Sequence, residues 1–255
     1  MCHTAAVVDH SFTDLTLATL YDSLNPWGPG DDFYLGLVRE ARSVLDIGCG
    51  TGQLLRRARD EGCQGRLTGL DPAAAMLVQA RQARPDGVEW VLGDTQVRAW
   101  QGEFDLVLMT GHAFQALVGD EEIRRCLHAV RAALGDGGRF VFETRNPAAR
   151  AWEKWTPERV REATAADGTT VRVWHEVQGD GLSGGRVRFT QTYDGDGWPA
   201  PRVSHSVLRF LDNESLHSLL ADAGLTVVEQ FGDWGRGAVT AESAEIITVA
   251  RRART

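Results

Sequence analysis

The sequence has little that would suit a membrane, and it lacks the features of an exported protein. No apolar run within its 255 residues is long enough to span a bilayer, so we expect no transmembrane helix. The opening residues, Met1 to Ala5, show no basic cluster followed by an apolar run, which predicts no signal peptide. These absences favour a cytoplasmic protein without a membrane partner.

Cysteine is also scarce, with four residues in the chain. None of them forms a C-x-x-C pair or joins histidines at a metal-ligand spacing, so we expect neither a disulfide framework nor a metal site. We interpret them as reduced thiols that behave as small buried hydrophobic residues. They are Cys2, Cys49, Cys63 and Cys126.

Positive charge is outweighed by negative charge. The chain has 27 basic and 35 acidic side chains, a net charge of −8. A nucleic-acid-binding protein usually presents a basic face, so this balance argues against a nucleic-acid partner. With 43% hydrophobic and 24% charged residues the composition is that of an ordinary globular protein. The length suits one large α/β domain, or one domain with an insertion.

What the chain does contain, after residue 40, is an alternation of short apolar runs with helical patterns. Such alternation predicts a parallel sheet covered by helices on both faces. A further helix and two strands are expected at the end of the chain. The predicted strands span 44–47, 67–70, 88–92, 104–109, 139–143, 226–231 and 245–250, and the predicted helices 53–61, 72–83, 121–134 and 213–223.

Two stretches depart from this alternation. The first combines a helical pattern over Phe12 to Tyr21 with a break rich in proline and glycine, and it predicts an N-terminal helical lid. The second carries three β-branched and aromatic runs, and it predicts an antiparallel β cap inserted after the fifth strand. The expected organisation is a lid over 1–40, a ligand-binding core over 41–147, the cap over 148–210, and the last helix and strands of the core over 211–255.

A glycine-rich loop from Asp46 to Gly52 follows the first strand and opens a helix. Its glycines allow a sharp turn with bare amides, and a helix N-terminus favours a carboxylate or phosphate. The dinucleotide-binding pattern needs glycine at its first, third and sixth positions, but the sixth here is Gln53. Asp46 would repel a pyrophosphate and suits a cationic amine. The loop therefore favours a ligand with an ammonium and a carboxylate over a dinucleotide.

Two more carboxylates follow the next two strands. Asp71 can accept both hydroxyls of a ribose, and Asp94, next to Thr95, can accept from an adenine amino group. Each also has an ordinary structural interpretation, Asp71 as a helix cap and Asp94 as the start of a turn. Carboxylates at the ends of three successive strands favour a ligand site at this edge of the sheet.

The segment from Val44 to Gly52 resembles the signature loop of class I S-adenosylmethionine-dependent methyltransferases. Asp71 falls where the ribose-binding acid of that family falls, and Asp94-Thr95 where its adenine-contacting pair falls. The resemblance covers about residues 40–145 well. It implies a Rossmann-like α/β fold with a mostly parallel seven-stranded sheet, one antiparallel strand at its end, and helices on both faces.

The resemblance also implies S-adenosylmethionine as the cofactor and S-adenosylhomocysteine as the product. Tyr21 and Trp27 either close over the cofactor or staple the N-terminus to the core. The expected cofactor contacts are Tyr21, Trp27, Asp46, Gly48, Cys49, Gly50, Gly52, Asp71, Pro72, Met76, Gly93, Asp94, Thr95 and Thr110.

His112 follows the fourth strand and is the best candidate for acid–base catalysis, because histidine titrates near neutral pH. It could equally shape the pocket without moving a proton. Glu143 and Arg145 could orient a polar acceptor or form a salt bridge, and the tryptophans of the cap indicate either an apolar acceptor or ordinary packing. The expected substrate pocket comprises His112, Phe114, Glu143, Arg145, Trp152, Trp155, Trp174 and His175.

The sequence thus predicts a monomeric or homodimeric methyltransferase that modifies an O or N atom of a small molecule, a natural product or metabolite. No Asn/Asp-Pro-Pro-aromatic motif follows the fourth strand, which disfavours amino methylation of nucleobases or glutamine. Three alternatives remain open: a pericyclase or decarboxylase that binds the cofactor without methylating, a sensor without turnover, and an NAD-dependent dehydrogenase.

Overall fold

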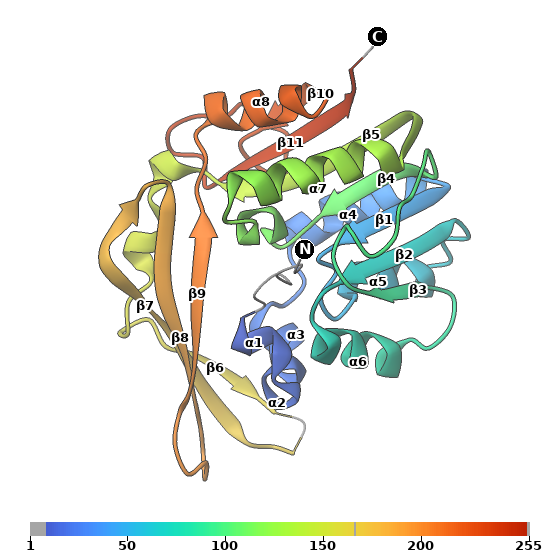
Figure 1. The fold of residues 1–255 in the computed structure, drawn as a ribbon. Helices are drawn as coiled ribbons and strands as arrows, with labels where there is room; N and C mark the ends of the chain where they lie inside the picture. The colour runs from blue at the N-terminus through green and yellow to red at the C-terminus, as the bar shows by residue number, and fades with distance from the viewer. Residues whose placement is uncertain (1–8, 166, 254–255) are drawn as a thin grey trace, which may run out of the picture.

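A mixed seven-stranded sheet lies at the centre of the structure, a computed structural model that describes residues 9–165 and 167–253 (Figure 1). Its strands are β1 (Ser43–Ile47), β2 (Arg66–Asp71), β3 (Glu89–Leu92), β4 (Phe104–Met109), β5 (Leu134–Arg145), β10 (Leu225–Phe231) and β11 (Glu245–Arg252). They lie in the order β10-β11-β5-β4-β1-β2-β3. The pairs among β1 to β5 are parallel, and β11 is antiparallel to both of its neighbours. The predicted fold is confirmed, with the antiparallel strand second from the edge.

Helices cover both faces of this sheet, as predicted. The apolar residues of α4 (Pro29–Glu40) and α5 (Gln53–Asp60) pack on one face, and α6 (Ala74–Ala83) lies beside α5. On the other face lie α7 (Asp120–Ala133) and α8 (Asn213–Asp222). This arrangement leaves the carboxyl ends of the parallel strands as the edge where a ligand can bind.

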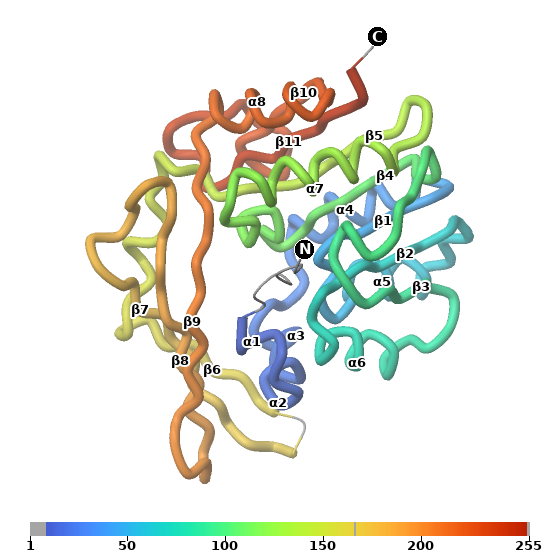
Figure 2. Tube along the Cα trace, in the orientation of Figure 1, coloured from blue at the N-terminus to red at the C-terminus, as the bar shows by residue number. Residues whose placement is uncertain are grey.

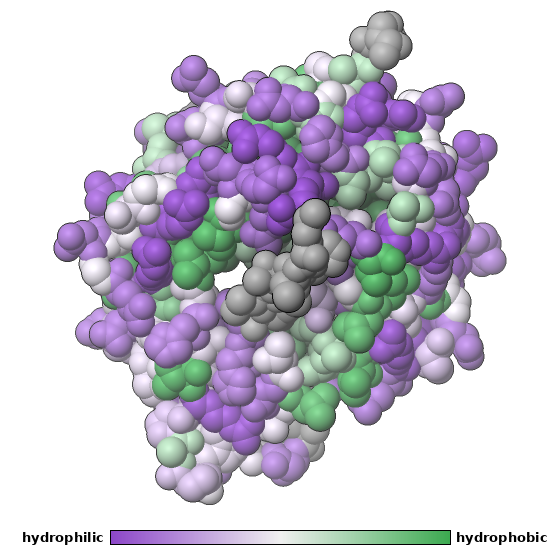
Figure 3. Space-filling view, in the orientation of Figure 1, coloured by the Kyte–Doolittle hydropathy of each residue, from purple (hydrophilic) through white to green (hydrophobic). Residues whose placement is uncertain are grey.

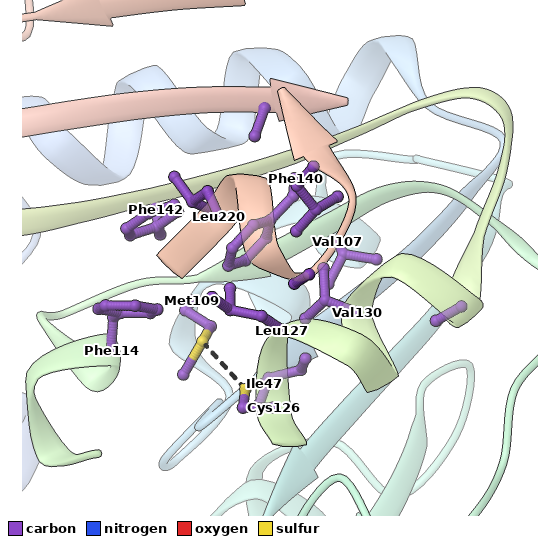
Figure 4. Packing of buried hydrophobic residues seen from close by; sticks show 14 of the residues in the cluster. Ile47, Val107, Met109, Phe114, Cys126, Leu127, Val130, Phe140, Phe142 and Leu220 are labelled. Atoms are coloured by element: carbon purple, nitrogen blue, oxygen red, sulfur yellow. Dashed lines mark hydrogen bonds between the residues drawn. The ribbon is translucent and has the colours of Figure 1, made fainter. Parts of the chain in front are cut away.

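The core between α7 and the sheet combines aliphatic side chains with stacked aromatic rings (Figure 4). Ile123, Leu127 and Val130 follow one face of α7 at helical spacing and meet this core. Phe142 of β5 stacks on Phe140 with ring centroids 4.6 Å apart. Such packing fixes β4 and β5, whose ends carry the residues considered below.

A separate antiparallel sheet follows the fifth strand, as predicted. Its strands are β6 (Arg161–Thr164), β7 (Thr170–Ser183), β8 (Arg186–Gly195) and β9 (Arg202–Arg209), and they pair in that order. Two short 3₁₀ turns, η2 (Pro147–Ala149) and η3 (Ala151–Lys154), lead into it. β6 was not predicted, because only Ala163 among its four residues is buried and the strand lacks an apolar pattern.

Three short helices lie between the antiparallel sheet and α6 (Figures 1 and 2). They are α1 (His10–Thr13), α2 (Leu15–Thr19) and α3 (Tyr21–Leu24). The single predicted helix is broken because the Asp14 carboxylate accepts from the backbone N–H groups of Thr16 and Leu17, at 2.8 and 3.0 Å, and so starts a new helix. Leu17, Leu20 and Leu24 pack against Val171, Val173 and Tyr193 of the antiparallel sheet.

The helical lid is therefore shorter than the predicted 1–40. Because Tyr34 and Leu37 of α4 belong to the core beside the sheet, α4 is part of the layer that covers the sheet. Residues 1–8 of the predicted lid, Cys2 among them, lie outside the described residues. The described part of the lid is α1 to α3.

Leu20 tests whether the lid is docked as the structure shows. Its side chain is 0% exposed, whereas Leu15 on the adjacent α2 is 58% exposed. We expect Leu20→Ala to lower the free energy of unfolding by about 2–5 kcal/mol, and Leu15→Ala by less than about 0.5 kcal/mol. Urea unfolding of both variants measures this. Equal effects at the two positions would show that the lid does not pack on the antiparallel sheet.

Candidate active site at the carboxyl edge of the sheet

The loop between β1 and α5 needs glycine for two reasons. Gly48 and Gly52 both have a φ of 73°, in the left-handed region that side chains disfavour. A Cβ on Gly48 would lie 2.8 Å from the Cβ of Ala113, and one on Gly52 would lie 2.2 Å from the Trp90 ring. Any larger residue at either position would displace the loop from its place beside the β4 loop and β3.

Asp71, at the end of β2, joins this loop to α6. One carboxylate oxygen accepts from the Gly50 N–H and the other from the Ala73 N–H, each at 2.8 Å. Burial raises the pKa of this carboxyl, and the two backbone hydrogen bonds oppose that rise. Asp71 is not the predicted helix cap, because the N-cap of α6 is Ala73, but its hydrogen bond to the Ala73 N–H orders the turn before α6. Its ribose contact stays a prediction.

Asp46 has a buried acceptor that lacks a donor. Its side chain is 1% exposed, and among the described residues its Oδ1 has no hydrogen-bond partner. Burial, together with Asp71 and Glu143, raises its pKa well above the usual value. An unpartnered buried carboxylate is costly, and a cationic ligand group would relieve that cost. Asp46 therefore fits the predicted contact with an ammonium.

Asp94 begins a turn after β3, which is the structural role expected for it. Asp94 accepts from the Gln96 N–H at 2.8 Å, and Gly93, whose φ is 138°, donates to the Asp71 carbonyl at 3.0 Å. Thr95 is half-buried beside Asp94. The turn brings Asp94 next to the end of β2, and its adenine contact stays a prediction.

Tyr21 of α3 reaches over the glycine loop. A Cβ on Gly50 would lie 3.8 Å from the Tyr21 ring, and one on Gly111 would lie 3.6 Å from the Tyr21 hydroxyl. Burial raises the pKa of Tyr21 to about 12, helped by Asp71 and Asp22, so the hydroxyl is protonated at neutral pH. The closing of Tyr21 over the cofactor stays a prediction.

α3 is held against the loop by Asp22, a residue that the sequence did not single out. Its carboxylate accepts from the Thr51 hydroxyl and from Arg56 of α5, the latter at 2.6 Å. Trp27 makes contacts of the kind expected of a staple, and its contact with the cofactor stays a prediction. Its indole N–H donates to Asp32 at 2.7 Å, and Arg57 lies 5.6 Å from its ring centre, so it ties the start of α4 to α5.

His112 occupies a strained position between two carboxylates. Its φ of 64° is left-handed, which is uncommon for residues other than glycine. The backbone N–H donates to Glu143 Oε1 at 2.7 Å, and Nε2 donates to Glu245 Oε2 at 2.8 Å. Glu143 also accepts from the Tyr34 hydroxyl, and burial raises the pKa of Glu143. These contacts fix both the backbone and the ring of His112.

Sequence reasoning missed Glu245 and Tyr34 because no motif links them to His112. Glu245 lies 133 residues away along the chain and reaches it only through the pairing of β11 with β5. Tyr34 lies in α4, where its helical spacing predicts core packing. The structure adds both residues to the candidate site.

Arg145 ends β5 at the same edge. Gln115, in the short turn η1 (Ala113–Ala116), accepts through its side-chain oxygen from the Arg145 backbone N–H at 3.1 Å and from Nη1 at 3.2 Å. The Trp155 ring centre lies 5.4 Å from the guanidinium carbon. Burial lowers the pKa of Arg145, and the carboxylates of Glu245 and Glu143 oppose that fall.

The two predicted pocket residues on β7 lie on opposite faces of the antiparallel sheet. Along β7, His175 shares the inward face with Val173, and Trp174 alternates with both, so Trp174 points away from the core. The predicted pocket contact of Trp174 is therefore wrong. Trp155 lies 4.8 Å from Phe189 and 6.3 Å from His175, measured between ring centres. Burial, with Arg161 and Arg145, lowers the pKa of His175 to about 4, which keeps it neutral at pH 7.

Trp152 and Phe114 serve packing. Trp152 meets Phe210 edge-on at 4.8 Å, and with Trp155 it lines a cavity of about 300 Å³ that no residue of the glycine loop lines. Phe114 stacks on Phe142 at 4.6 Å within the core (Figure 4), so its predicted place in the substrate pocket is wrong.

The remaining predicted cofactor contacts differ in exposure. Cys49 is buried beside α6 with Leu77, and Met76 is buried with Tyr21 near it. Pro72 is exposed and Thr110 is half-buried. Their contacts with the cofactor stay predictions.

The structure gathers these side chains in one place. Asp46, Asp71, His112, Glu143 and Arg145, which we call the carboxyl-edge site, stand at the ends of β1, β2, β4 and β5. The lid and the antiparallel sheet lie in front of that edge (Figure 1), and Figure 3 shows that this face of the molecule is hollowed between the antiparallel sheet and the core.

Comparison with known proteins identifies this arrangement. Residues 44–138 match a family described as a methyltransferase domain. The chain is 31% identical over 242 residues to dTDP-3-amino-3,6-dideoxy-alpha-D-glucopyranose N,N-dimethyltransferase of Streptomyces fradiae, an alignment that covers 88% of this chain and 89% of the relative. The chain belongs to the S-adenosylmethionine-dependent methyltransferases. The family expected from the sequence is confirmed.

Solved structures of methyltransferases share the fold. CcbJ from Streptomyces caelestis aligns with a TM-score of 0.70 at 23% identity, covering 88% of this chain and 94% of CcbJ. CalS10, an amino pentose methyltransferase from Micromonospora echinaspora solved with S-adenosylmethionine bound, aligns with a TM-score of 0.63 at 24% identity, covering 89% and 93%.

S-adenosylmethionine is the cofactor of this methyltransferase, and the carboxyl-edge site fits it. The unpartnered oxygen of Asp46 suits its ammonium group, and the glycine loop between β1 and α5 presents backbone amides at the start of a helix. Within the described ranges, no helix is long and apolar enough to cross a membrane.

Asp71 tests the cofactor site. Because its carboxylate orders the Gly50 amide, we expect Asp71→Ala to weaken S-adenosylhomocysteine binding by about 1–3 kcal/mol. The exposed Asp86, which follows α6 at the opposite edge of the sheet, loses the same charge when changed to Ala and serves as the control. Isothermal calorimetry on both variants gives the two dissociation constants. An unchanged constant in Asp71→Ala would remove this residue from the cofactor site.

Proposed function

We propose that this methyltransferase transfers a methyl group to an N or O atom of a small molecule, an amino sugar or a related natural product or metabolite, with His112 as the general base. The observation that carries the proposal is the fixation of His112 by Glu143 and Glu245 at the carboxyl-edge site. The Streptomyces fradiae relative is named for N,N-dimethylation of an amino sugar, which supports this class of acceptor.

His112 is arranged to take a proton. Because Nε2 donates to Glu245, the lone pair of the ring is on Nδ1, which has no hydrogen-bond partner among the described residues. A negative carboxylate at Nε2 also stabilises the imidazolium that forms when Nδ1 accepts a proton from an ammonium or hydroxyl acceptor. Glu245 is the positioning residue in this scheme, since it acts through the histidine ring.

Orientation is the second task of the protein. S-adenosylmethionine supplies an electrophilic methyl group on a sulfonium sulfur. Displacement at that carbon must be in line, so holding the acceptor rigidly contributes several kcal/mol, up to about 10. Tyr21 above the glycine loop and the fixed β4 loop are the parts of this chain suited to that positioning.

Several features support a small acceptor. The lid and the antiparallel sheet stand in front of the carboxyl edge (Figure 1), where a large polymer would need an open surface. The net charge of −8 is unfavourable for a nucleic-acid acceptor. The three described cysteines are free thiols, which supports a cytoplasmic location. We propose a monomer or homodimer.

Product formation tests the proposed reaction. Purified protein is incubated with S-adenosylmethionine and separate panels of amino sugars, other amines, phenols and sugar hydroxyls, and S-adenosylhomocysteine is quantified by mass spectrometry. We expect acceptor-dependent product in at least one N or O panel. Cofactor binding without product across all panels would instead favour the non-methylating alternative.

His112→Ala separates catalysis from pocket shaping. If Nδ1 is the base, turnover should fall by about 10²–10⁴ with little change in S-adenosylhomocysteine affinity. His128, exposed on α7, provides the matched control as His128→Ala. Initial rates with the acceptor found above, measured across pH, check this. A loss below tenfold would reduce His112 to a pocket-lining residue.

A further inference from the structure

Arg145 differs from the other half-buried arginines near the lid in what it contacts. Arg56 is paired with Asp22 at 2.6 Å, and Arg202 with Asp14 at 2.8 Å. In the described part of the chain, no carboxylate lies within 4.0 Å of the Arg145 guanidinium. Its one side-chain hydrogen bond there is to the neutral carboxamide of Gln115. The half-buried surroundings of Arg145 lower its pKa, and an anion beside the guanidinium would favour its charged form.

The acidic residue directly across the sheet from Arg145 is hydrogen-bonded to another side chain. Glu245 is the register partner of Arg145 across β5 and β11, the position from which a carboxylate would most easily reach it. Its Oε2 is instead engaged by His112 at 2.8 Å. Glu143, on the same strand, accepts from Tyr34 and from the His112 backbone. Nε and Nη2 of Arg145 therefore have no partner among the described residues.

The guanidinium is held in a fixed place. Gln115 is 1% exposed, and its amide nitrogen donates to the Arg209 carbonyl at 2.9 Å, so its oxygen is fixed toward Arg145. Trp155 covers the guanidinium, with its ring centre 5.4 Å away. The guanidinium is planar, and when it is held in place its remaining N–H groups can bind a carboxylate or phosphate through two parallel hydrogen bonds.

The rings beside Arg145 also indicate what kind of molecule would carry the anionic group. Trp155, Phe189 and His175 form a group of rings within 6.3 Å of one another on the inner face of the antiparallel sheet. Burial and the nearby charges of Arg161 and Arg145 lower the pKa of His175 to about 4, so this ring adds no charge at neutral pH. Apolar rings beside one fixed cation suit a molecule with a flat or apolar body and an acidic group.

We propose that Arg145 binds an anionic group, a carboxylate or phosphate, on the methyl acceptor, with the body of the acceptor against Trp155 and Phe189. The inference rests on the proposed function and narrows its acceptor to an acidic small molecule. Arg145 and His112 would then hold the two ends of the acceptor, since they lie on adjacent strand ends joined through Gln115 and Glu143.

Small probes test the inference without the natural acceptor. Benzoate, phenyl phosphate and the neutral benzamide are titrated by NMR into protein saturated with S-adenosylhomocysteine. We expect the wild type to bind at least one acidic probe about tenfold or more tightly than benzamide. Arg145→Gln should remove that preference, and Arg145→Lys should retain part of it, because lysine keeps the charge and loses the fork. Tighter binding of phenyl phosphate than of benzoate would identify the anion as a phosphate.

Arg188→Gln is the matched control, since Arg188 is exposed on β8 of the same sheet, and it should keep the full preference. S-adenosylhomocysteine affinity and melting temperature, measured on each variant, show whether the protein is folded. No acid preference in the wild type, or preference retained in Arg145→Gln, overturns the inference. So does a selective loss of S-adenosylhomocysteine affinity in Arg145→Gln, which would place Arg145 on the cofactor carboxylate. Failure of the wild type to bind S-adenosylhomocysteine would instead contradict the proposed function.

Discussion

The cost of burying charge at the carboxyl edge of the sheet governs the arrangement of this site. Asp46, Asp71 and Glu143 are all buried there, and burial raises the pKa of each. Asp71 and Glu143 offset part of that cost by accepting hydrogen bonds from backbone N–H groups, which at the same time orders the loops that donate them. Asp46 keeps one oxygen without a donor. The same carboxylates that shape the loops thus leave a negative site for a cationic ligand.

The lid is fixed by contacts to both sheets at once. Asp22 ties α3 to the glycine loop and α5, while Asp14 is paired with Arg202 of β9 and Arg161 of β6 donates to the Leu24 carbonyl. Because each of these residues joins segments far apart in the chain, the antiparallel sheet, the lid and the glycine loop form one continuous contact. Tyr21 is held over the glycine loop by this contact rather than by its own hydrogen bonds.

The sequence predicted those features that depend on residues close together in the chain. The glycine loop, the strand ends at Asp71 and Asp94, and the alternation of strands and helices were readable because each depends on neighbouring residues. Gln115 and Glu245 were not, since each acquires its role through a partner on another strand. The error at Trp174 was avoidable, because the valines at 171, 173 and 177 already share one face of the strand and Trp174 alternates with them. Phe114 was misplaced because an apolar residue after a strand can turn into the core or into a pocket with equal ease.

The backbone conformation of His112 lowers the stability of the folded protein. A left-handed backbone at a residue other than glycine costs about 1–3 kcal/mol and persists only where the surroundings fix it. Here the Glu143 carboxylate accepts the His112 N–H, and Glu143 is itself held by Tyr34 of α4. Packing alone would be satisfied by a relaxed backbone and an apolar side chain at this position. The strain and the two carboxylates together orient one ring nitrogen, and that orientation is what proton transfer from an acceptor requires.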